Sequence, residues 1–500
     1  MAFPPSRPIC DVAALRDIEA RHADAEPPLM ERAGAAAVPP ALTFLAPGGP
    51  PPLVVCGPGN NGGDGFVLAR LLRERGFAPV VVFAGAREKL PADARTACER
   101  YCAAGGTILG EIPRREYALA VDALFGIGLQ RPLADDYAAL VARINGLGCP
   151  VLALDIPSGL CADTGRVLGC AVRADSTLAF IALKPGLLTL DGPEHCGAVS
   201  VCDLGLAAEG DLPARGRSVT PALFASQLKP RPLNSHKGRM GSVGILGGAP
   251  GMLGAALLAG RAALKLGAGR VFVGLLDATA PAVDFMQPEL MLRGPQDILA
   301  AGLATALAAG PGLGQGDAAR ALLGQALAAD LPLVLDADAL NLLASHPVLA
   351  KKVSRRRAAT LITPHPLEAA RLLGSDTAAV QADRLRAACA LAQKLNAVTI
   401  LKGCGSVIAA PDGRWFINGS GNPGMASAGM GDVLTGLAAT LLAQGWEAEA
   451  AALCAAHLHG LAADLLAGGG IGPAGMTAGE SIDAARRIFN AWLLDGRRGN

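Results

Sequence analysis

The chain has 500 residues, of which 17% are charged and 4% are aromatic, and its formal net charge at pH 7 is +1. Such a balanced charge produces no strong field that would favour nucleic acid or a membrane surface as a partner, and we expect neither. The charged fraction lies below the roughly 25% of an average soluble protein, and the abundance of Ala, Gly, Val and Leu suits parallel strands buried under helices. A chain of this length accommodates two large domains or three smaller ones.

The opening residues 1–24 contain no long apolar run, so we expect no signal peptide. The run that comes nearest to a membrane span, residues 298–310, is shorter than the roughly 18 residues that a span requires. The 12 cysteines are scattered, and no two have the C-x-x-C spacing of a zinc or redox site. These features predict a cytoplasmic protein with reduced thiols.

In the first half, short apolar runs end in Gly or Pro and alternate with helical segments. These runs lie in segments 51–76, 78–85, 117–126, 149–159 and 176–186, and the first one continues through a Gly-rich loop into a helix. Alternation of this kind predicts a parallel sheet with helices on both faces. Ligands of such sheets bind beyond the carboxyl ends of the strands.

The alternation stops near residues 207–235, which contain several prolines and charges, and we interpret this segment as a linker. It resumes in segments 241–276, 331–343, 358–374 and 397–410, and an Ala-rich helix follows later in the chain. The sequence therefore predicts two α/β domains, residues 1–213 and residues 226–500, each with its own strands and its own polar motifs.

Polar residues of the first domain gather where predicted strands end. They are Asn60, Asn61, Gly62, Gly63 and Asp64 in a Gly-rich turn, Asp122 at the end of another strand, and Asp155 with Ser158 after a third. A Gly-rich turn between a strand and a helix can hold a phosphate, and Asn and Asp oxygens can ligate a cation or sugar hydroxyls. Each Asp alone could instead cap a helix or form a turn. Four polar groups at neighbouring strand ends are harder to explain as caps.

The second domain contains the stretch Asn422–Gly445, in which residues of little bulk precede one carboxylate, Asp432, and a long apolar helix. Small residues let the backbone approach a ligand, and the start of a helix attracts anions. Asp432 could simply cap the helix, or it could serve a phosphate site as a catalytic carboxylate.

Further motifs of this domain favour the phosphate site. They are the bare turn GPGLG at 310–314, the segment LDADALN at 335–341, His365 between two prolines, and the segment LKGCGS with Lys402 and Ser406. Phosphoryl transfer needs a cation and Gly-rich turns without bulky side chains, because it depends on positioning and charge neutralisation. A lone histidine such as His365 is more often structural. The pair His457-x-His459 directs its rings to different faces of a helix, so we expect no metal there.

Taken together, these motifs resemble the family of bifunctional NAD(P)H-hydrate repair enzymes, which join an epimerase to an ADP-dependent dehydratase. In the first domain the resemblance rests on LMERAG at 29–34, GNNGGDGFVLAR at 59–70, VDALFGIGL at 121–129 and LDIPSGLCADTGRV at 154–167. In the second it rests on HKGRMGSVGILGG at 236–248, GPGLG, LDADALN, TPHP at 363–366, LKGCGS and GMASAGMGDVLTG at 424–436. The match follows the family's order over nearly the full length. It implies an N-terminal Rossmann-like αβα domain and a C-terminal ribokinase-like αβα domain.

The resemblance implies a role for each matching residue of the first domain. Asp155 should be catalytic and should bind the hydrated dinucleotide together with Asn60, Asn61, Gly62, Gly63 and Asp64 and with a closing loop of Gly126, Ile127, Gly128, Leu129, Gln130, Arg131 and Pro132. Asn61, Asp122 and Ser158 should ligate potassium.

In the second domain the resemblance implies that Ala255, Gly314, His365 and Asp432 bind the hydrate, and that Lys402, Gly403, Cys404, Gly405, Ser406 and Gly431 bind ADP with Mg²⁺. Asp432 should take the proton of the ring hydroxyl, which then attacks the terminal phosphate of ADP. NAD(P)H, AMP and phosphate should result. The resemblance further implies small-molecule substrates, and we expect a homo-oligomer.

One residue departs from the family's pattern. Leu367 follows TPHP, where the family usually has Gly, and this affects the expected shape of the loop beside His365. Two alternatives stay open: a ribokinase-like vitamin kinase fused to a ligand-binding domain, and a first domain that serves as a binding scaffold, as relatives in mRNA decapping do. The motifs TPHP and LDADALN argue against the kinase. The presence of Asp122, Asp155 and Ser158 argues against the scaffold.

Overall fold

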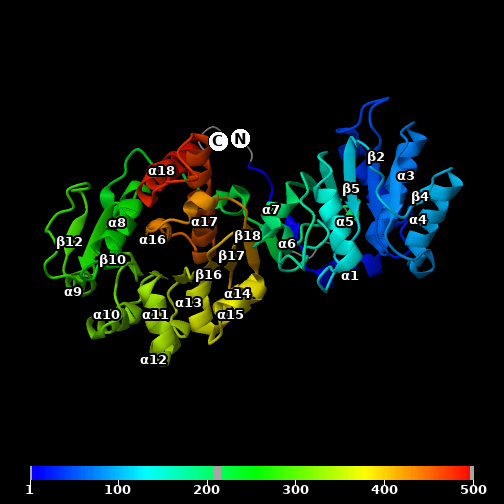
Figure 1. The fold of residues 1–500 in the computed structure, drawn as a ribbon. Coiled ribbons are helices and arrows are strands. Elements are labelled where there is room, and N and C mark those ends of the chain that lie inside the picture. Colours follow the sequence, from blue (N-terminus) through cyan, green and yellow to red (C-terminus); the bar gives the residue numbers. More distant parts are fainter. Residues whose placement is uncertain (1–2, 207–214, 496–500) are drawn as a thin grey trace. The chain divides into compact units, whose positions relative to one another are not determined.

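The protein folds into two compact units (Figure 1). The structure is a computed structural model and describes residues 3–206 and 215–495. Residues 7–216 form the first unit, and residues 217–500 together with the N-terminal residues up to Ser6 form the second. The division falls between Gly216 and Arg217, inside the segment that the sequence analysis interpreted as a linker.

The first unit has a parallel sheet. Among the described residues its strands follow the order β4-β3-β2-β5-β6-β7-β8, and all neighbours are parallel. The elements of the unit are β1 (Pro8–Ile9), α1 (Val12–Arg21), α2 (Leu29–Leu42), β2 (Pro52–Cys56), α3 (Asn60–Glu74), β3 (Val80–Phe83), η1 (Arg87–Lys89), α4 (Ala92–Ala103), β4 (Ile108–Leu109), β5 (Leu119–Ala123), α5 (Asp135–Asn145), β6 (Val151–Leu154), β7 (Ser176–Phe180), α6 (Pro185–Leu188), α7 (Gly192–Cys196) and β8 (Ala198–Cys202).

Strand β2 shows why this sheet is buried on both faces. Its alternate side chains belong to two cores: Val54 and Cys56 pack with α2, α3 and α4, whereas Leu53 and Val55 pack with α5. A strand covered on both faces needs an unbroken apolar sequence, and the run PLVVC provides it. Because β2 has β3 on one side and β5 on the other, the strand order reverses there. The carboxyl ends of β2 and β5 therefore form the switch point where ligands of such sheets bind.

The second unit has a mixed sheet with helices on both faces (Figure 1). Its strands follow the order β9-β18-β17-β16-β15-β14-β13-β10-β11-β12, parallel from β16 to β12 and antiparallel from β16 to β18. The elements are β9 (Gly216–Ser218), η3 (Pro221–Leu223), η4 (Ala225–Gln227), η5 (Lys237–Met240), β10 (Ser242–Gly247), α8 (Leu253–Lys265), β11 (Arg270–Leu275), β12 (Met291–Arg293), α9 (Pro295–Ala300), β13 (Ala306–Ala309), α10 (Asp317–Ala328), β14 (Leu333–Leu335), α11 (Asp338–Ser345), α12 (Pro347–Ser354), β15 (Thr360–Ile362), α13 (Pro366–Leu373), α14 (Thr377–Ala382), α15 (Arg384–Leu395), β16 (Val398–Leu401), β17 (Ser406–Ala409), β18 (Trp415–Asn418), η6 (Pro423–Met425), α16 (Met430–Ala443), α17 (Ala448–Gly468) and α18 (Ala478–Asp495).

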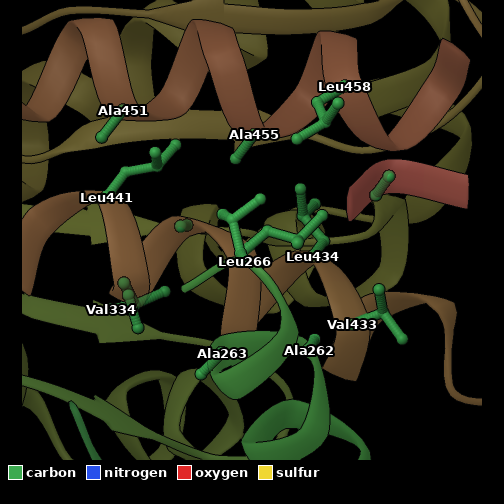
Figure 2. Packing of buried hydrophobic residues seen from close by; sticks show 14 of the residues in the cluster. Ala262, Ala263, Leu266, Val334, Val433, Leu434, Leu441, Ala451, Ala455 and Leu458 are labelled. Atoms are coloured by element: carbon green, nitrogen blue, oxygen red, sulfur yellow. The ribbon is translucent and has the colours of Figure 1, made fainter. Parts of the chain in front are cut away.

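Helices α8, α16, α17 and α18 share one core with the sheet. Figure 2 shows Ala451 of α17 beside Leu441 of α16, and Leu458 of α17 on the side of Leu434 of α16, and all four are buried. The alanines let the helices approach closely. Protein interiors are close-packed and resist small shifts, so the burial of α16 among these helices holds it in place.

Helix α17 corrects one expectation. From the sequence we expected no run long enough for a membrane span. Yet α17 has 21 residues and, within the described part of the chain, is the one helix long and apolar enough for one. Most of its length is buried inside the second unit, where it packs on α16. A helix covered by its own protein is a core helix, and its composition is explained by that burial.

The expected linker is largely structured where the structure describes it. Residues 207–214 lie outside the described part of the chain, but β9, η3 and η4 follow directly and belong to the second unit. Val219 is buried, and Phe224 is fully buried in the core of that unit. By its contacts the second unit therefore begins near Arg217, and the domain limits at residues 213 and 226 stay predictions.

Candidate active sites

The first candidate site lies at the switch point of the first unit, where β2, β5 and β6 end. The loop after β2 turns sharply into α3. Gly57 and Gly62 permit this turn, because a Cβ on Gly57 would overlap Leu124 O and a Cβ on Gly62 would overlap Gly57 O. Helix α3 starts after Gly59 without a side-chain cap. The N–H groups of its first turn and the positive end of its dipole favour an anionic ligand there.

Two predicted site residues meet around Gly126. A Cβ on Gly126 would lie 3.0 Å from Asp155 Oδ2 and 3.4 Å from Asn61 Cβ, so both side chains border the loop after β5. Asp155 has a φ of 70°, in the left-handed region that costs energy for a residue with a side chain. The Asn61 amide is buried, and in the described part of the chain neither of its polar atoms has a hydrogen-bond partner. An unpartnered buried amide is costly and points to a ligand that completes it.

Asp122 and Ser158 form a buried pair next to this loop. Ser158 donates to Asp122 through its Oγ at 2.6 Å and through its N at 2.8 Å, and Leu124 N donates at 3.2 Å. Burial raises the pKa of Asp122 to about 6, although these hydrogen bonds oppose the rise. Phe125 N donates to Ser158 Oγ at 2.8 Å, which places the pair one residue from Gly126.

A charged cluster lies behind Asp155. Burial raises the pKa of Asp64 well above its usual value, and the carboxylates of Asp155 and Glu19 add to the rise. Lys184 opposes it: this lysine is buried, and its Nζ donates to Asp155 Oδ1 and to Phe180 O. Lys184 was not among the site residues predicted from the sequence. Its signal was a lysine inside the apolar run IALKPG, since a buried cation requires a partner.

The predicted closing loop, residues 126–132, follows β5 and has several exposed residues. Leu129 N donates to Gly126 O at 3.4 Å, so the loop contains a turn beside the Gly126 contact. Its closure over a substrate stays a prediction.

The second candidate site lies where β14 and β16 end, next to the first turn of α16. Lys402 Nζ donates to Asp336 Oδ1 at 2.9 Å, and Thr435 Oγ1 donates to Asp336 Oδ2 at 2.9 Å. A Cβ on Gly431 would lie 3.2 Å from Lys402 Nζ, so a side chain at this position of the helix would crowd the ammonium. Burial acts to lower the pKa of Lys402, but Asp336 and Glu368 outweigh it and the pKa is raised.

Asp432 lies in the first turn of α16 and does not cap it. The N-cap is Gly429, with a left-handed φ of 89°, and no side chain makes a capping hydrogen bond. Burial raises the pKa of Asp432 to about 6; Asp336 and Asp338 add to the rise, and Lys402 opposes it. The capping interpretation is therefore wrong. A carboxylate with this pKa can accept a proton near neutral pH.

His365 is the N-cap of α13. Its Nδ1 accepts from Leu367 N at 3.1 Å, and its own N donates to Glu368 Oε2 at 2.8 Å, which completes a capping box. Burial and the nearby charge of Lys402 lower the pKa of His365. With Nδ1 accepting, the neutral ring carries its proton on Nε2. Leu367 lies inside the helix and is 43% exposed, so the departure from the family glycine disturbs no contact of the ring.

The turn after β13 brings further predicted residues to the second site. A Cβ on Gly312 would lie 3.3 Å from Ala255 Cβ, so this turn packs on the start of α8. Gly314 N donates to Asp338 Oδ2 at 2.8 Å, and the charge of Asp338 acts on Asp432. Gly314 and Asp432 are thus connected through Asp338.

The segment 402–406 is held from behind by Arg384, which the sequence analysis missed. Arg384 is buried, and its Nη2 donates to Leu401 O at 3.3 Å and to Lys402 O at 3.2 Å. A Cβ on Gly403, whose φ is 139°, would lie 2.8 Å from the guanidinium. Thr435 and Glu368 were missed as well. Each is a single polar residue on a helix, and only the spacing of Thr435, three residues after Asp432, was a signal.

No group of three or more His, Cys, Asp or Glu side chains in the described part of the chain has the arrangement of a metal site. His457 Nδ1 lies 2.9 Å from Asn418 Oδ1, and its ring stacks on Trp492. All 12 cysteines are free thiols.

Comparison with known proteins gives matches over both units. The family model described as YjeF-related protein N-terminus matches residues 26–186, and the one described as NAD(P)H-hydrate dehydratase matches residues 243–481. The bifunctional NAD(P)H-hydrate repair enzyme of Coxiella burnetii is 40% identical over 487 residues, covering 92% of this chain and 94% of its own. The enzyme of that name from Escherichia coli is 40% identical over 454 residues, covering 89% and 86%. The ADP/ATP-dependent NAD(P)H-hydrate dehydratase of Bacillus subtilis, co-crystallised with ATP and Mg²⁺, is 32% identical with a TM-score of 0.48, covering 54% of this chain and 96% of that one.

Proposed function

The chain belongs to the family of bifunctional NAD(P)H-hydrate repair enzymes, and we propose that its two sites carry the family's two activities. The first site interconverts the R and S hydrates of NADH and NADPH. The second dehydrates the S hydrate at the expense of ADP. The observation that carries the proposal is Asp432. Its carboxylate lies in the first turn of α16, does not cap the helix, has a raised pKa and is influenced by the ammonium of Lys402.

In the second site Asp432 acts as the general base. Its carboxylate takes the proton of the ring hydroxyl, and the hydroxyl oxygen attacks the terminal phosphorus of ADP. The bond from that phosphorus to the bridging oxygen breaks, AMP leaves, and a phosphate ester remains on the ring. The ester's C–O bond then breaks, phosphate leaves, and loss of a ring proton restores NAD(P)H. A pKa of about 6 suits this base, because it is ionised at neutral pH yet close enough to hold a proton.

Neighbouring residues position the reactants. The Lys402 ammonium, fixed by Asp336, faces the nucleotide phosphates. Because Gly431 has no side chain, the first turn of α16 lies close to this ammonium. Ala255, Gly314 and His365 hold the hydrate. Mg²⁺ is bound by one or two carboxylates together with substrate phosphates, and here Asp338 and Asp432, whose charges act on each other, would hold it with the phosphates of ADP. Bound there, Mg²⁺ would neutralise charge on the phosphates.

In the first site Asp155 faces the reacting ring, and the turn 60–64 and the loop 126–132 hold the dinucleotide. Potassium fits Asn61, Asp122 and Ser158. The Asn61 amide lacks a partner among the described residues, the Asp122 carboxylate is buried, and the Ser158 hydroxyl supplies a third oxygen. A hard cation prefers such oxygens. Potassium would offset the buried negative charge and hold the loop after β5.

The proposal is tested by incubating the full chain with both hydrate epimers and ADP while NADH absorbance is followed. Both epimers should be converted, with one AMP formed for each NADH. Asp155→Asn should convert only the S epimer at the enzymatic rate, and Asp432→Asn should convert neither. A stable phosphorylated product from a vitamin alcohol, with no NADH, would establish the kinase alternative instead.

We further propose that the protein is cytoplasmic and that it assembles with copies of itself. We also propose that its two units work independently. Free thiols support the compartment. Phe285 and Met286 support the assembly, because these neighbours are 83% and 79% exposed, and exposed apolar patches commonly mark interfaces. Light scattering of wild type and of Phe285→Ser/Met286→Ser should show loss of the oligomer in the variant. A monomer mass for wild type would overturn the assembly.

A further inference from the structure

Lys184 is a buried cation at the N-terminus of α6, and the proposed reaction assigns it no role. It is 1% exposed, and its Nζ donates to Asp155 Oδ1 and, at 2.8 Å, to Phe180 O. The other lysine of residues 7–216, Lys89, is exposed. Lysine is rarely buried unless it is paired, because an isolated buried charge is very costly. The pair with Asp155 therefore explains why this lysine can be buried.

The contacts distinguish the two oxygens of Asp155. Oδ1 accepts from Lys184 and, at 3.4 Å, from Phe180 N. Oδ2 lies on the side of Gly126, 3.0 Å from where a Cβ would stand. The left-handed backbone of Asp155, with a φ of 70°, persists only when its surroundings hold it.

We propose that Lys184 is a positioning residue of the epimerase, which anchors Asp155 by Oδ1 and so presents an ionised Oδ2 to the ring of the hydrate. This inference rests on the proposed function, in which Asp155 faces the substrate. Lys184 acts through Asp155, since its own burial keeps it from the substrate.

The charges around the pair define what its loss would do. The titratable groups that face it are Cys10 before α1, Glu19 on α1 and Asp64 on α3, with Arg16 beside Glu19. Burial raises the pKa of Asp64 and of Glu19, the Asp155 carboxylate adds to both rises, and Lys184 opposes both. Without the ammonium Asp155 would lose the contact that favours its charged form, and Glu19 and Asp64 would hold a proton up to higher pH. A reaction that needs ionised Asp155 would then fail at a higher pH.

The experiment measures initial epimerisation rates of full-length variants from about pH 5 to about pH 9, a range that spans the titration of carboxylates and histidines. Lys184→Met removes the charge and keeps the length of the side chain. We expect kcat near neutral pH to fall about tenfold or more, and the acid limb of the profile to move up by about one pH unit or more, since an opposite charge at contact shifts a pKa by about 1–3 units. KM should change less than kcat.

Three further variants complete the test. Lys184→Arg keeps the cation, so its acid limb should stay at the wild-type pH even where kcat is lower. Lys89→Met removes the exposed lysine and should match wild type. Asp155→Asn tests the proposed function itself and should lose epimerase activity. The dehydratase rate of each chain reports only that the second unit is intact. The near-UV circular dichroism of tyrosine reports whether the first unit has folded, because all 3 tyrosines belong to residues 7–216.

Each outcome of these measurements supports or overturns the role of Lys184 or the proposed function of the site. A folded Lys184→Met chain with an unshifted acid limb would overturn the inference, because lost packing lowers the rate equally at every pH. If Lys184→Met does not fold, an acid limb displaced upward in Lys184→Arg would overturn it. Normal epimerisation by Asp155→Asn would remove the proposed function of this site, whereas an inactive Asp155→Asn beside an unaffected Lys184→Met would remove only the role of Lys184.

Discussion

Lys402 Nζ donates to Asp336 Oδ1 at 2.9 Å beside the first turn of α16, so one buried carboxylate fixes the ammonium closest to the proposed phosphate site. The two groups act on Asp432 in opposite directions. Asp336 raises the pKa of Asp432, and Lys402 lowers it, while burial provides the largest rise. The proton affinity of the proposed base is therefore set by neighbours that can be changed one at a time.

This relationship predicts the pH dependence of the dehydratase. Asp432 takes a proton only when it is ionised, and its pKa is raised to about 6, so kcat should fall as the pH drops through about 6. Asp336→Asn removes a carboxylate that raises this pKa, and its acid limb should move to lower pH. Profiles of kcat against pH at saturating ADP and hydrate measure the acid limbs of wild type and of Asp336→Asn. A wild-type limb near the ordinary aspartate value of about 4 would contradict the prediction.

Asp432→Asn should reduce dehydratase turnover at least about a hundredfold, because a positioned general base contributes roughly 10²- to 10⁴-fold. Stability should not fall. A raised pKa means that the folded state binds the proton more tightly than the unfolded chain, so ionised Asp432 costs stability above its pKa, and Asn removes that cost. Steady-state rates, thermal melting and ADP titration test this, with epimerase activity as the internal control. A variant that melts early but turns over normally would make Asp432 structural.

Epimerisation should be slower when sodium or lithium replaces potassium at equal ionic strength. The site of Asn61, Asp122 and Ser158 has one carboxylate, which suits a singly charged ion. Potassium should also raise the melting temperature of the first unit, since a ligand that binds only the folded state stabilises it. Both responses should vanish in Asp122→Ala. If all three salts give the same rate and the same melting temperature, Asp122 serves only as the partner of Ser158.

Arg384→Met should weaken ADP binding more than hydrate binding. The guanidinium holds the carbonyls of Leu401 and Lys402 at the start of the proposed nucleotide loop. A buried carbonyl left without a donor costs about 1–3 kcal/mol, so we expect the KM for ADP to rise about tenfold and the KM for the hydrate to change little. Arg386→Met is the matched control, because the Arg386 side chain is 81% exposed. An equal rise in both KM values would contradict this role.

Where motifs follow strands, the sequence alone indicated which residues the fold brings together. Asn61 and Asp155 border the same loop because both lie beyond the carboxyl ends of parallel strands. Lys184 and Arg384 could not be found this way. Each is a single cation whose partners lie many residues away in the chain, and only the folded structure brings them together. Phe224 was hidden for a similar reason, since the prolines around it indicated a linker while its burial depends on residues far along the chain.

The boundary of the second unit leads to a prediction about fragments. Residues 7–216 should epimerise on their own, and residues 217–500 should dehydrate the S hydrate. Residues 226–500 should melt much lower or fail to fold, because the cut removes Val219 and Phe224, which are both buried. Loss of a buried Phe side chain costs about 3–5 kcal/mol, a large part of the stability of a domain.

The N-terminal residues refine this prediction, since residues 3–6 pack on the second unit. The Phe3 ring meets the Trp492 ring edge-on at 6.4 Å, and Ser6 Oγ donates to Ser218 O at 2.7 Å. Phe3→Ala in the full chain should therefore lower the melting temperature of the second unit and leave epimerase activity unchanged. Tryptophan fluorescence isolates the effect, because all 3 tryptophans belong to residues 217–500. If Phe3→Ala melts like wild type, the N-terminal contacts add nothing to the stability of the second unit. If residues 226–500 melt like residues 217–500, the second domain begins at residue 226 as the sequence predicted.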